Sequence, residues 1–214
     1  MGATKETTTP AGLVHDEGVQ RVSVVGNAGS GKTVLAKRLS ALLEVPHIEL
    51  DAIHHLPGWT PIDPEAFRSE LDRLTTGEGW VIDGNYRTVV MDGPVWERAD
   101  AVVWLDLPRR TVMRQVITRT LSRIMRRQEL WNGNRERAGN LLSLDPYTSI
   151  IAWAWTQHAN YERRLGAAMA SPRFSHLGFV HLRSRRQVER WLADLRGASR
   201  RAPTVSDQAA TPGP

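Results

Sequence analysis

The sequence contains no cysteine among its 214 residues. This absence excludes a disulfide-stabilised scaffold, a catalytic thiolate and any zinc site that needs thiolate ligands, and it agrees with a reducing compartment. A metal site in this chain would therefore use oxygen or imidazole ligands.

Long apolar stretches are also missing. No apolar run approaches the roughly 18 residues that suggest a membrane-spanning helix, and the first residues, which are rich in Thr, lack the apolar segment of a signal peptide. We therefore expect a cytoplasmic protein without a membrane partner.

The composition is that of one globular domain. With 24 % charged and 41 % hydrophobic residues, the chain can bury one core of ordinary size but not two full domains. We expect a flexible leader over residues 1–18, a folded domain over 19–197 and a disordered tail over 198–214, where prolines stand among small polar residues.

Positive charge is concentrated in one segment. The formal net charge is only +5, but residues 109–137 hold nine arginines against Glu129 and Glu136. Such a segment is expected to meet anions, which could be nucleotide phosphates, nucleic acid or solvent ions. Composition does not distinguish among the three.

Short β-branched apolar runs alternate with stretches of helical spacing. This alternation predicts an α/β fold of three layers with a five-stranded parallel sheet. Residues 109–147 are expected to form a helical lid insertion, and 128–145 breaks the periodicity as a mobile connection would. The predicted strands are 22–25, 47–50, 80–82, 101–105 and 178–182, and the predicted helices are 33–43, 64–74, 109–127, 148–168 and 185–195.

A phosphate-binding motif lies between the first predicted strand and helix. Residues 26–33 read GNAGSGKT and satisfy the pattern GxxxxGK[ST]. Its glycines allow positive φ and close approach to phosphate, so backbone N–H groups and the helix N-terminus converge on phosphate oxygens. We expect Lys32 to reach the β- and γ-phosphates of ATP and the Thr33 hydroxyl to take one Mg²⁺ position. The expected nucleotide-binding residues are Gly26, Asn27, Ala28, Gly29, Ser30, Gly31, Lys32 and Thr33.

The alternative is a glycine-rich turn that binds nothing. It is disfavoured because the strand, the loop, the Lys-Thr pair and an amphipathic helix all agree with phosphate binding.

The predicted strand at 80–82 is followed by an acid and, further on, by an arginine. Asp83 ends a buried apolar strand, as a Walker B acid does, and would hold Mg²⁺ through water. The pattern of Asp83, Gly84 and Arg87 resembles the adenylate-kinase-like branch of P-loop kinases. This resemblance implies that Gly84 and Arg87 bind the acceptor, with Arg87 holding its phosphate. A surface salt bridge is the alternative role for Arg87.

A closer resemblance rests on three segments. They are GNAGSGKT, the run Leu50-Asp51-Ala52-Ile53 followed by Pro57-Gly58-Trp59, and residues 80–86. Together they resemble the bacterial "DNA topology modulation protein" family of small predicted kinases over about residues 21–125. The resemblance implies the kinase fold and ATP binding but does not define a substrate.

Asp51 and Trp59 are candidates for the acceptor site. Asp51 is expected to end the second strand, the edge where open α/β sheets bind ligands. In the related shikimate and gluconate kinases an acid near this place orients or deprotonates the substrate hydroxyl; capping of the next turn is the alternative. Trp59 would either stack on the acceptor or pack a loop. His54 and His55 are adjacent, so their side chains point apart and chelation of a metal by both is disfavoured.

The arginine-rich helix offers cations for phosphoryl transfer. Arg119 and Arg123 lie four apart on one face, which Arg126 and Arg127 are expected to extend. Guanidinium groups that close over the phosphates would stabilise the transition state, so Arg119 and Arg123 are expected to be catalytic. The alternative is a solvated helix face, with the lid arginines elsewhere, at Arg135 or Arg137.

Two further segments complete the expectations. Arg183 follows the last strand, where this fold usually places backbone against adenine, and is a nucleotide-binding candidate by position. Trp153 and Trp155 are expected to pack in the core or against a partner helix rather than to bind a cofactor.

The sequence therefore predicts an enzyme that uses ATP and Mg²⁺ to phosphorylate a small acceptor, either a nucleoside monophosphate or a hydroxyl compound. A toxin or antibiotic-resistance kinase would carry the same motifs. A nucleotide-dependent protein that binds nucleic acid through the arginine-rich helix is the alternative from another class, disfavoured because no known nucleic-acid-binding signature is present.

Overall fold

The computed structural model describes residues 19–141 and 143–199. The leader expected at 1–18 and residues 200–214 of the expected tail lie outside the described residues. None of the described helices is long and apolar enough to cross a membrane.

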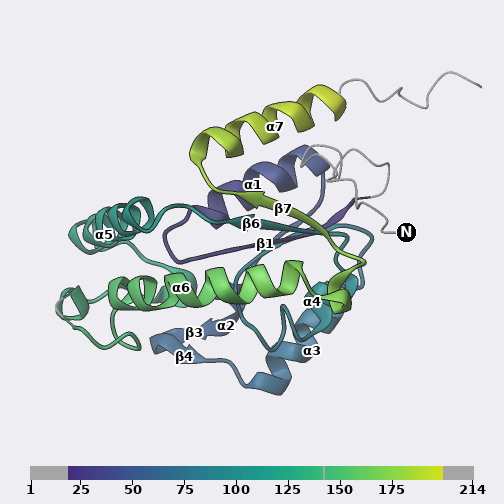
Figure 1. Cartoon of the computed structure of the whole chain (residues 1–214). Coiled ribbons are helices and arrows are strands. Elements are labelled where there is room, and N and C mark those ends of the chain that lie inside the picture. Colours follow the sequence, from purple (N-terminus) through teal and green to yellow (C-terminus); the bar gives the residue numbers. More distant parts are fainter. Residues whose placement is uncertain (1–18, 142, 200–214) are drawn as a thin grey trace, which may run out of the picture.

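A five-stranded sheet forms the centre of the domain (Figure 1). The strand order is β2-β5-β1-β6-β7, and every neighbouring pair is parallel. The predicted α/β fold with five parallel strands is confirmed. Because β1 lies between β5 and β6, the loop that follows it stands at the middle of the carboxyl edge, where such sheets bind ligands. The strands are β1 (Arg21–Gly26), β2 (His47–Glu49), β5 (Trp80–Asp83), β6 (Ala101–Leu105) and β7 (Gly178–Leu182).

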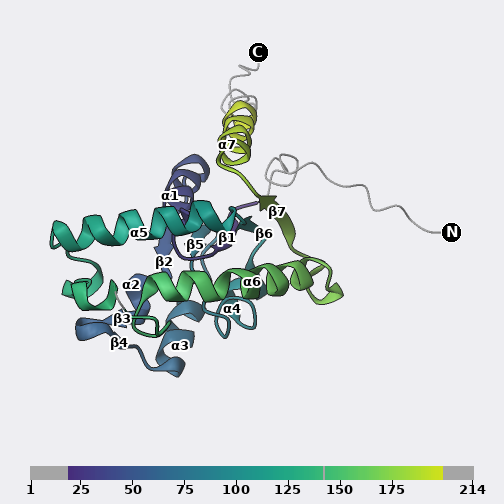
Figure 2. The same ribbon diagram turned by 60° about the vertical axis from the view of Figure 1, so that its left-hand side comes forward.

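Helices cover both faces of the sheet and give the three predicted layers (Figures 1 and 2). Helices α1 (Lys32–Leu43) and α7 (Arg185–Ser199) lie on one face. Leu39 and Trp191 pack there with the buried strand residue Val24. The other face carries α3 (Pro64–Leu74), α4 (Pro94–Arg98) and α6 (Ile150–Met169).

Helix α5 (Arg109–Met125) runs beside α6 above the carboxyl edge of the sheet (Figure 2). Helix α6 begins after Ser149, whose hydroxyl accepts a hydrogen bond from the Ala152 N–H at 3.4 Å and so caps its first turn. The close packing of α5 and α6 places their inner faces over the phosphate loop.

The chain departs from the sequence prediction after β2. This strand ends at Glu49, and α2 (Leu50–His54) follows, so the prediction that Asp51 ends the second strand is wrong. Leu50, the first residue of α2, is fully buried. In the sequence, a buried apolar residue at this position looks like a continuation of the preceding strand. Asp51 lies in the first turn of this helix.

A small hairpin that the sequence did not predict follows α2. It consists of β3 (His55–Leu56), a 3₁₀ turn over Pro57–Trp59 and β4 (Thr60–Pro61), with the two strands antiparallel. Strands of two residues are too short to show hydrophobic periodicity. The five-residue helix α4 was missed for the same reason.

Candidate active site

The loop between β1 and α1 has the backbone of a phosphate cradle. Gly29 and Gly31 have φ of 80° and 97°, a conformation that favours glycine. A Cβ atom built on Gly31 would meet nothing within 4 Å, so the loop is open there. The Nζ atom of Lys32 donates to the Asn27 carbonyl at 3.1 Å, and Thr33 stands in the first turn of α1.

Three neighbours hold this loop in place. The Asn85 side chain bonds to both backbone groups of Gly26, and the Asn27 amide donates to the Ala154 carbonyl of α6 at 2.7 Å. Gly29 lies directly under α5, because a Cβ atom at this position would be 2.8 Å from the Cβ atom of Val116. The sequence motif is therefore fixed by residues far away in the chain.

The cradle opens into a cleft of ≈1870 Å³. It is lined by the phosphate loop, α2, the hairpin, the loop after β5, α5 and the start of α6. The expected site residues among its lining are Ala28, Gly29, Gly31, Lys32, Thr33, Asp51, Trp59, Asp83, Gly84, Arg87, Arg119 and Arg123. Side chains predicted from separate parts of the sequence thus meet at one cavity.

Lys32 is the central cation of the cleft. Burial lowers its pKa, while the negative charges of Asp51 and Asp83 act in the opposite direction. Arg119 adds to the lowering, and Glu49 is a further acid within electrostatic reach. A buried ammonium group near three acids is suited to bind an added anion, because a phosphate would restore the electrostatic stabilisation lost on leaving water.

The residues proposed for Mg²⁺ have suitable donor atoms. Asp83 is 3 % exposed, and its Oδ1 atom accepts no hydrogen bond from the residues that the structure describes, although the His47 Nε2 atom lies 3.4 Å away. The Thr33 side chain lines the same cleft. No three acidic or histidine side chains of residues 19–141 and 143–199 are grouped closely enough to hold a metal by themselves. This donor set fits Mg²⁺, which typically keeps waters and binds through few carboxylates together with phosphate oxygens.

Asp51 belongs to a hydrogen-bonded group on the acceptor side of the cleft. The Tyr86 hydroxyl donates to the Asp51 Oδ1 atom at 2.7 Å and lies 3.4 Å from the His55 Nε2 atom. Burial, followed by the charge of Asp51, raises the pKa of Tyr86, so the phenol stays protonated and remains a donor. Tyr86 thereby fixes one oxygen of Asp51. The predicted capping role for Asp51 has no support, because the cap residue of α2 is Glu49 and makes no side-chain cap bond.

Glu49 is a site residue that sequence reasoning missed. It lies on β2 opposite Asp83 on β5 and lines the cleft. Burial and the neighbouring Asp83 raise the pKa of the Glu49 carboxyl, and an interaction with the Trp131 side chain acts in the opposite direction. The available signal was an acid at the carboxyl end of an apolar strand, the same signal that identified Asp83.

The two arginines singled out on α5 differ in their surroundings. The Nε atom of Arg119 is buried and has no hydrogen-bond partner among the described residues, and burial followed by the charge of Arg123 lowers the pKa of this guanidinium. Arg123 instead forms an ion pair with Glu136 at 2.9 Å. The expected extension of this face is wrong, because α5 ends at Met125 and leaves Arg126 and Arg127 outside the helix.

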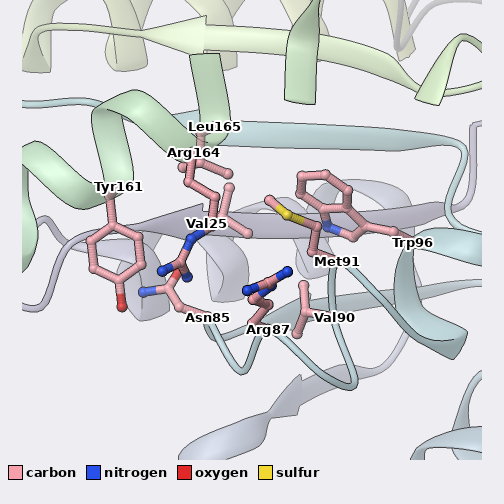
Figure 3. A pocket seen from close by; sticks show the side chains of 9 residues that line it. All are labelled: Val25, Asn85, Arg87, Val90, Met91, Trp96, Tyr161, Arg164 and Leu165. Carbon is pink, nitrogen blue, oxygen red and sulfur yellow. The ribbon is translucent and has the colours of Figure 1, made fainter. Parts of the chain in front are cut away.

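Arg87 and Arg164 share a small pocket beside the main cleft (Figure 3). The Nε atom of Arg87 donates to Asp92 at 2.8 Å, and its exposed side chain makes the predicted alternative, a surface salt bridge. Asp92 also pairs with Arg173 at 2.9 Å. Arg164 forms no ion pair with an acid in the described part of the chain. Figure 3 shows its guanidinium group near the guanidinium group of Arg87 and the side-chain amide of Asn85.

Three remaining candidates have structural surroundings of their own. Arg183 lies after β7, 3.6 Å from Asp106, and is not among the described residues that line the cleft. Gly84 has no room for a side chain, because a Cβ atom would lie 2.7 Å from Leu50. Trp155 is 56 % exposed rather than packed in a core, and Arg109 lies over its ring at 4.9 Å.

No family model matches the chain, and no curated protein matches it. The resemblance to the DNA topology modulation protein family therefore stays a prediction.

Solved structures give distant similarities. A shikimate kinase from Bacteroides thetaiotaomicron is 19% identical with a TM-score of 0.49, covering 83% of this chain and 97% of that one. A gluconokinase from Sinorhizobium meliloti is 15% identical with a TM-score of 0.46, covering 86% and 93%. A shikimate kinase from Acinetobacter baumannii, solved in complex with shikimate, is 15% identical with a TM-score of 0.48, covering 87% and 96%. Similarities of this degree do not define an activity for the chain.

Proposed function

We propose that this protein is a P-loop kinase that transfers the γ-phosphoryl group of ATP to a hydroxyl group of a small acceptor. The observation that carries the proposal is that Lys32, in the phosphate cradle, and Asp51, held by Tyr86, line one cleft and interact electrostatically. A cation for phosphate and a base for a hydroxyl are the two groups that such a transfer needs.

The nucleotide would bind with its phosphates in the cradle. Backbone N–H groups of residues 26–33 and the Lys32 ammonium would hold the β- and γ-phosphates. Thr33 and Asp83 would hold Mg²⁺, which when bound offsets charge on the phosphate oxygens. Arg119 supplies a second cation for the transferring group, and its unpartnered Nε atom supports this role.

The acceptor would lie between the cradle and the hairpin. Its hydroxyl oxygen forms the new bond to the γ-phosphorus while the bond from that phosphorus to the β,γ-bridging oxygen breaks. The hydroxyl proton moves to Asp51, whose second oxygen is not used by Tyr86, and ADP leaves with the bridging oxygen.

An acidic group on the acceptor is supported by Arg87 and Arg164. Arg87 and Arg164 both line the small pocket, and the Asp92 partner of Arg87 is shared with Arg173, so this end of the cleft carries excess positive charge. The pocket of ≈20 Å³ has room for a group of about one water in size. One oxygen of a carboxylate fits this space while the rest of the group lies in the main cleft, which Arg87 and Arg164 also line; a hydroxy acid is therefore the first candidate, and a nucleoside monophosphate, with its larger phosphate, is the second.

The nucleic-acid alternative has less support. Arg119 and Arg123 face the cleft, and Arg123 is paired with Glu136, so the two arginines are turned away from a surface that could track a duplex.

A screen of ADP formation tests the proposal. Purified protein with ATP and Mg²⁺ would be incubated with hydroxy acids, neutral polyols, aminoglycosides and nucleoside monophosphates, with Lys32→Ala as the control for contaminating activity. ADP formation that depends on both an acceptor and Lys32 is expected. Acceptor-independent turnover alone, or turnover that survives in Lys32→Ala, would reject the proposal.

A further inference from the structure

A short turn spans the mouth of the cleft. We call Trp131–Glu136 the strap. Asn132 and Gly133 have φ of 55° and 77°, the positive values that both central residues of a type I′ turn require, and Asn-Gly is the preferred pair for it. The Asn134 N–H donates to the Trp131 carbonyl at 3.1 Å and closes the turn, and the Leu130 N–H donates to the Asn134 carbonyl at 2.7 Å.

The strap is fastened to the hairpin that follows α2. The Asn132 amide donates to the His55 carbonyl at 2.6 Å, and the Asn134 amide donates to the Leu56 carbonyl at 2.9 Å. The Asn134 Oδ1 atom in turn accepts a hydrogen bond from the backbone N–H of Trp59 at 2.8 Å. Asn134 is 4 % exposed, so loss of these bonds would leave buried polar groups unpaired.

The other end of the strap is fastened to α5. Glu136 forms the ion pair with Arg123 at 2.9 Å, and both side chains are largely buried. The strap therefore connects the helix that carries the candidate phosphate-binding arginines to the hairpin beside Asp51. The sequence prediction treated this stretch as a mobile connection, but it is hydrogen-bonded on both sides.

The docked strap completes a wall of aromatic rings. Trp131 of the strap stacks on His55 with ring centroids 5.8 Å apart, and Trp59 meets His55 and Trp131 edge to face at 5.2 and 6.3 Å. All three line the same cleft as Asp51 and Glu49. The Trp131 side chain also lies close enough to Glu49 to lower the pKa of its carboxyl, so the wall adjoins the carboxylates of the cleft.

We infer that the strap forms part of the acceptor site and that its aromatic wall selects a hydroxylated ring over an open-chain compound. A saturated ring has a flat C–H face, which packs on an aromatic surface. It also has a rim of hydroxyl groups, which donate hydrogen bonds to carboxylates. The wall and the two acids offer these surfaces side by side. An open chain gains less, because it must lose more torsional freedom to present one face. This inference rests on the proposed function.

Isothermal titration calorimetry with two hydroxylated monocarboxylates, cyclic quinate and open-chain gluconate, tests the inference on the full chain. We expect quinate to bind more tightly than gluconate in the wild type. The variants Trp131→Ala and Asn134→Ala should each weaken quinate binding by roughly threefold to tenfold and reduce the difference between the two compounds. The affinity for ATP should change less than twofold.

Trp155→Ala is the matched control, because Trp155 is exposed and does not line the cleft. Circular dichroism shows whether Asn134→Ala is folded. If this variant is unfolded, the quinate affinity of Trp131→Ala alone decides the test. Equal affinity of the wild type for the two compounds, no detectable quinate binding, or unchanged quinate affinity in Trp131→Ala would overturn the inference. Lys32-dependent phosphorylation of any acceptor would leave the proposed function standing in each of these cases.

Discussion

The Asn85 side chain bonds to both backbone groups of Gly26. Its Oδ1 atom accepts the Gly26 N–H at 3.1 Å, and its Nδ2 atom donates to the Gly26 carbonyl at 2.5 Å. An amide that pairs with the backbone in this way replaces part of a strand ladder and fixes where the phosphate loop begins. Asn85 follows β5, so the loop after the strand with the candidate metal ligand positions the loop that would hold phosphate.

We predict that Asn85→Ala destabilises the domain by about 1–3 kcal/mol, because Gly26 is buried and its polar groups would lose their partners. ATP affinity should fall with stability, since the loop is no longer fixed. Chemical denaturation and nucleotide titration measure the two effects. Asn160→Ala is the control, because the half-buried Asn160 bonds, among the described residues, only to side chains of its own helix, and equal behaviour of both variants would contradict a positioning role for Asn85.

We predict that Lys32→Ala abolishes acceptor phosphorylation without lowering stability. A lowered pKa means that the protonated amine is less favourable in the folded chain than in the unfolded chain, so near pH 7 burial of this charge opposes folding. Removal of the group should leave the melting temperature unchanged or raise it. Arg38→Ala is the control on the same helix and should retain activity, because Arg38 pairs with Glu189 and is not among the described residues that line the cleft. A large drop in melting temperature for Lys32→Ala would indicate a structural role instead.

Asp51→Asn is expected to reduce kcat by about 10²–10⁴-fold, the usual contribution of a general base. Tyr86→Phe should have a smaller effect on kcat and leave the KM for ATP unchanged, because it removes only the hydrogen bond that orients Asp51. Steady-state kinetics with the acceptor found in the screen measure both. Tyr147→Phe, at an 89% exposed position, serves as control. Wild-type kcat in Asp51→Asn would exclude the base.

The arginines of α5 are expected to separate by their surroundings. Arg119→Ala should lower kcat by about 10²-fold or more, as loss of one transition-state donor does. Arg123→Ala should lower it less, because Arg123 is paired with Glu136, while the exposed Arg114 should be replaceable. Turnover and ATP dissociation constants for the three variants test the order. Near-wild-type turnover in all three would show that α5 does not serve the reaction.

Arg164→Ala should raise the KM for an acidic acceptor by roughly 10- to 100-fold, since hydrogen bonds to charged groups contribute about 1.5–3 kcal/mol. The KM for ATP should stay constant, because the small pocket is lined by residues outside the phosphate loop. Arg163→Ala, on the exposed side of α6, is the matched control. Equal increases in both KM values would place Arg164 in a general structural role.

The sequence by itself determined the sheet, most of its helices and the phosphate loop. These features depend on local patterns: β-branched runs define the buried strands, and the glycines with Lys32 and Thr33 define the phosphate loop, although distant residues such as Asn85 hold that loop in place. Asp83 was placed correctly at the end of its strand for the same reason. The short α2 and its hairpin escaped prediction because neither is long enough to carry a period.

Tertiary structure alone decided which side chains share the cleft. Asn85 is hydrogen-bonded to Gly26, which is 59 positions away in the sequence, and Asn134 is hydrogen-bonded to Leu56, which is 78 positions away. Arg164 reaches the pocket of Arg87 only because α6 packs across the face of the sheet (Figures 1 and 3). No local spacing encodes such pairs, because the packing of whole helices against the sheet sets the distance between them.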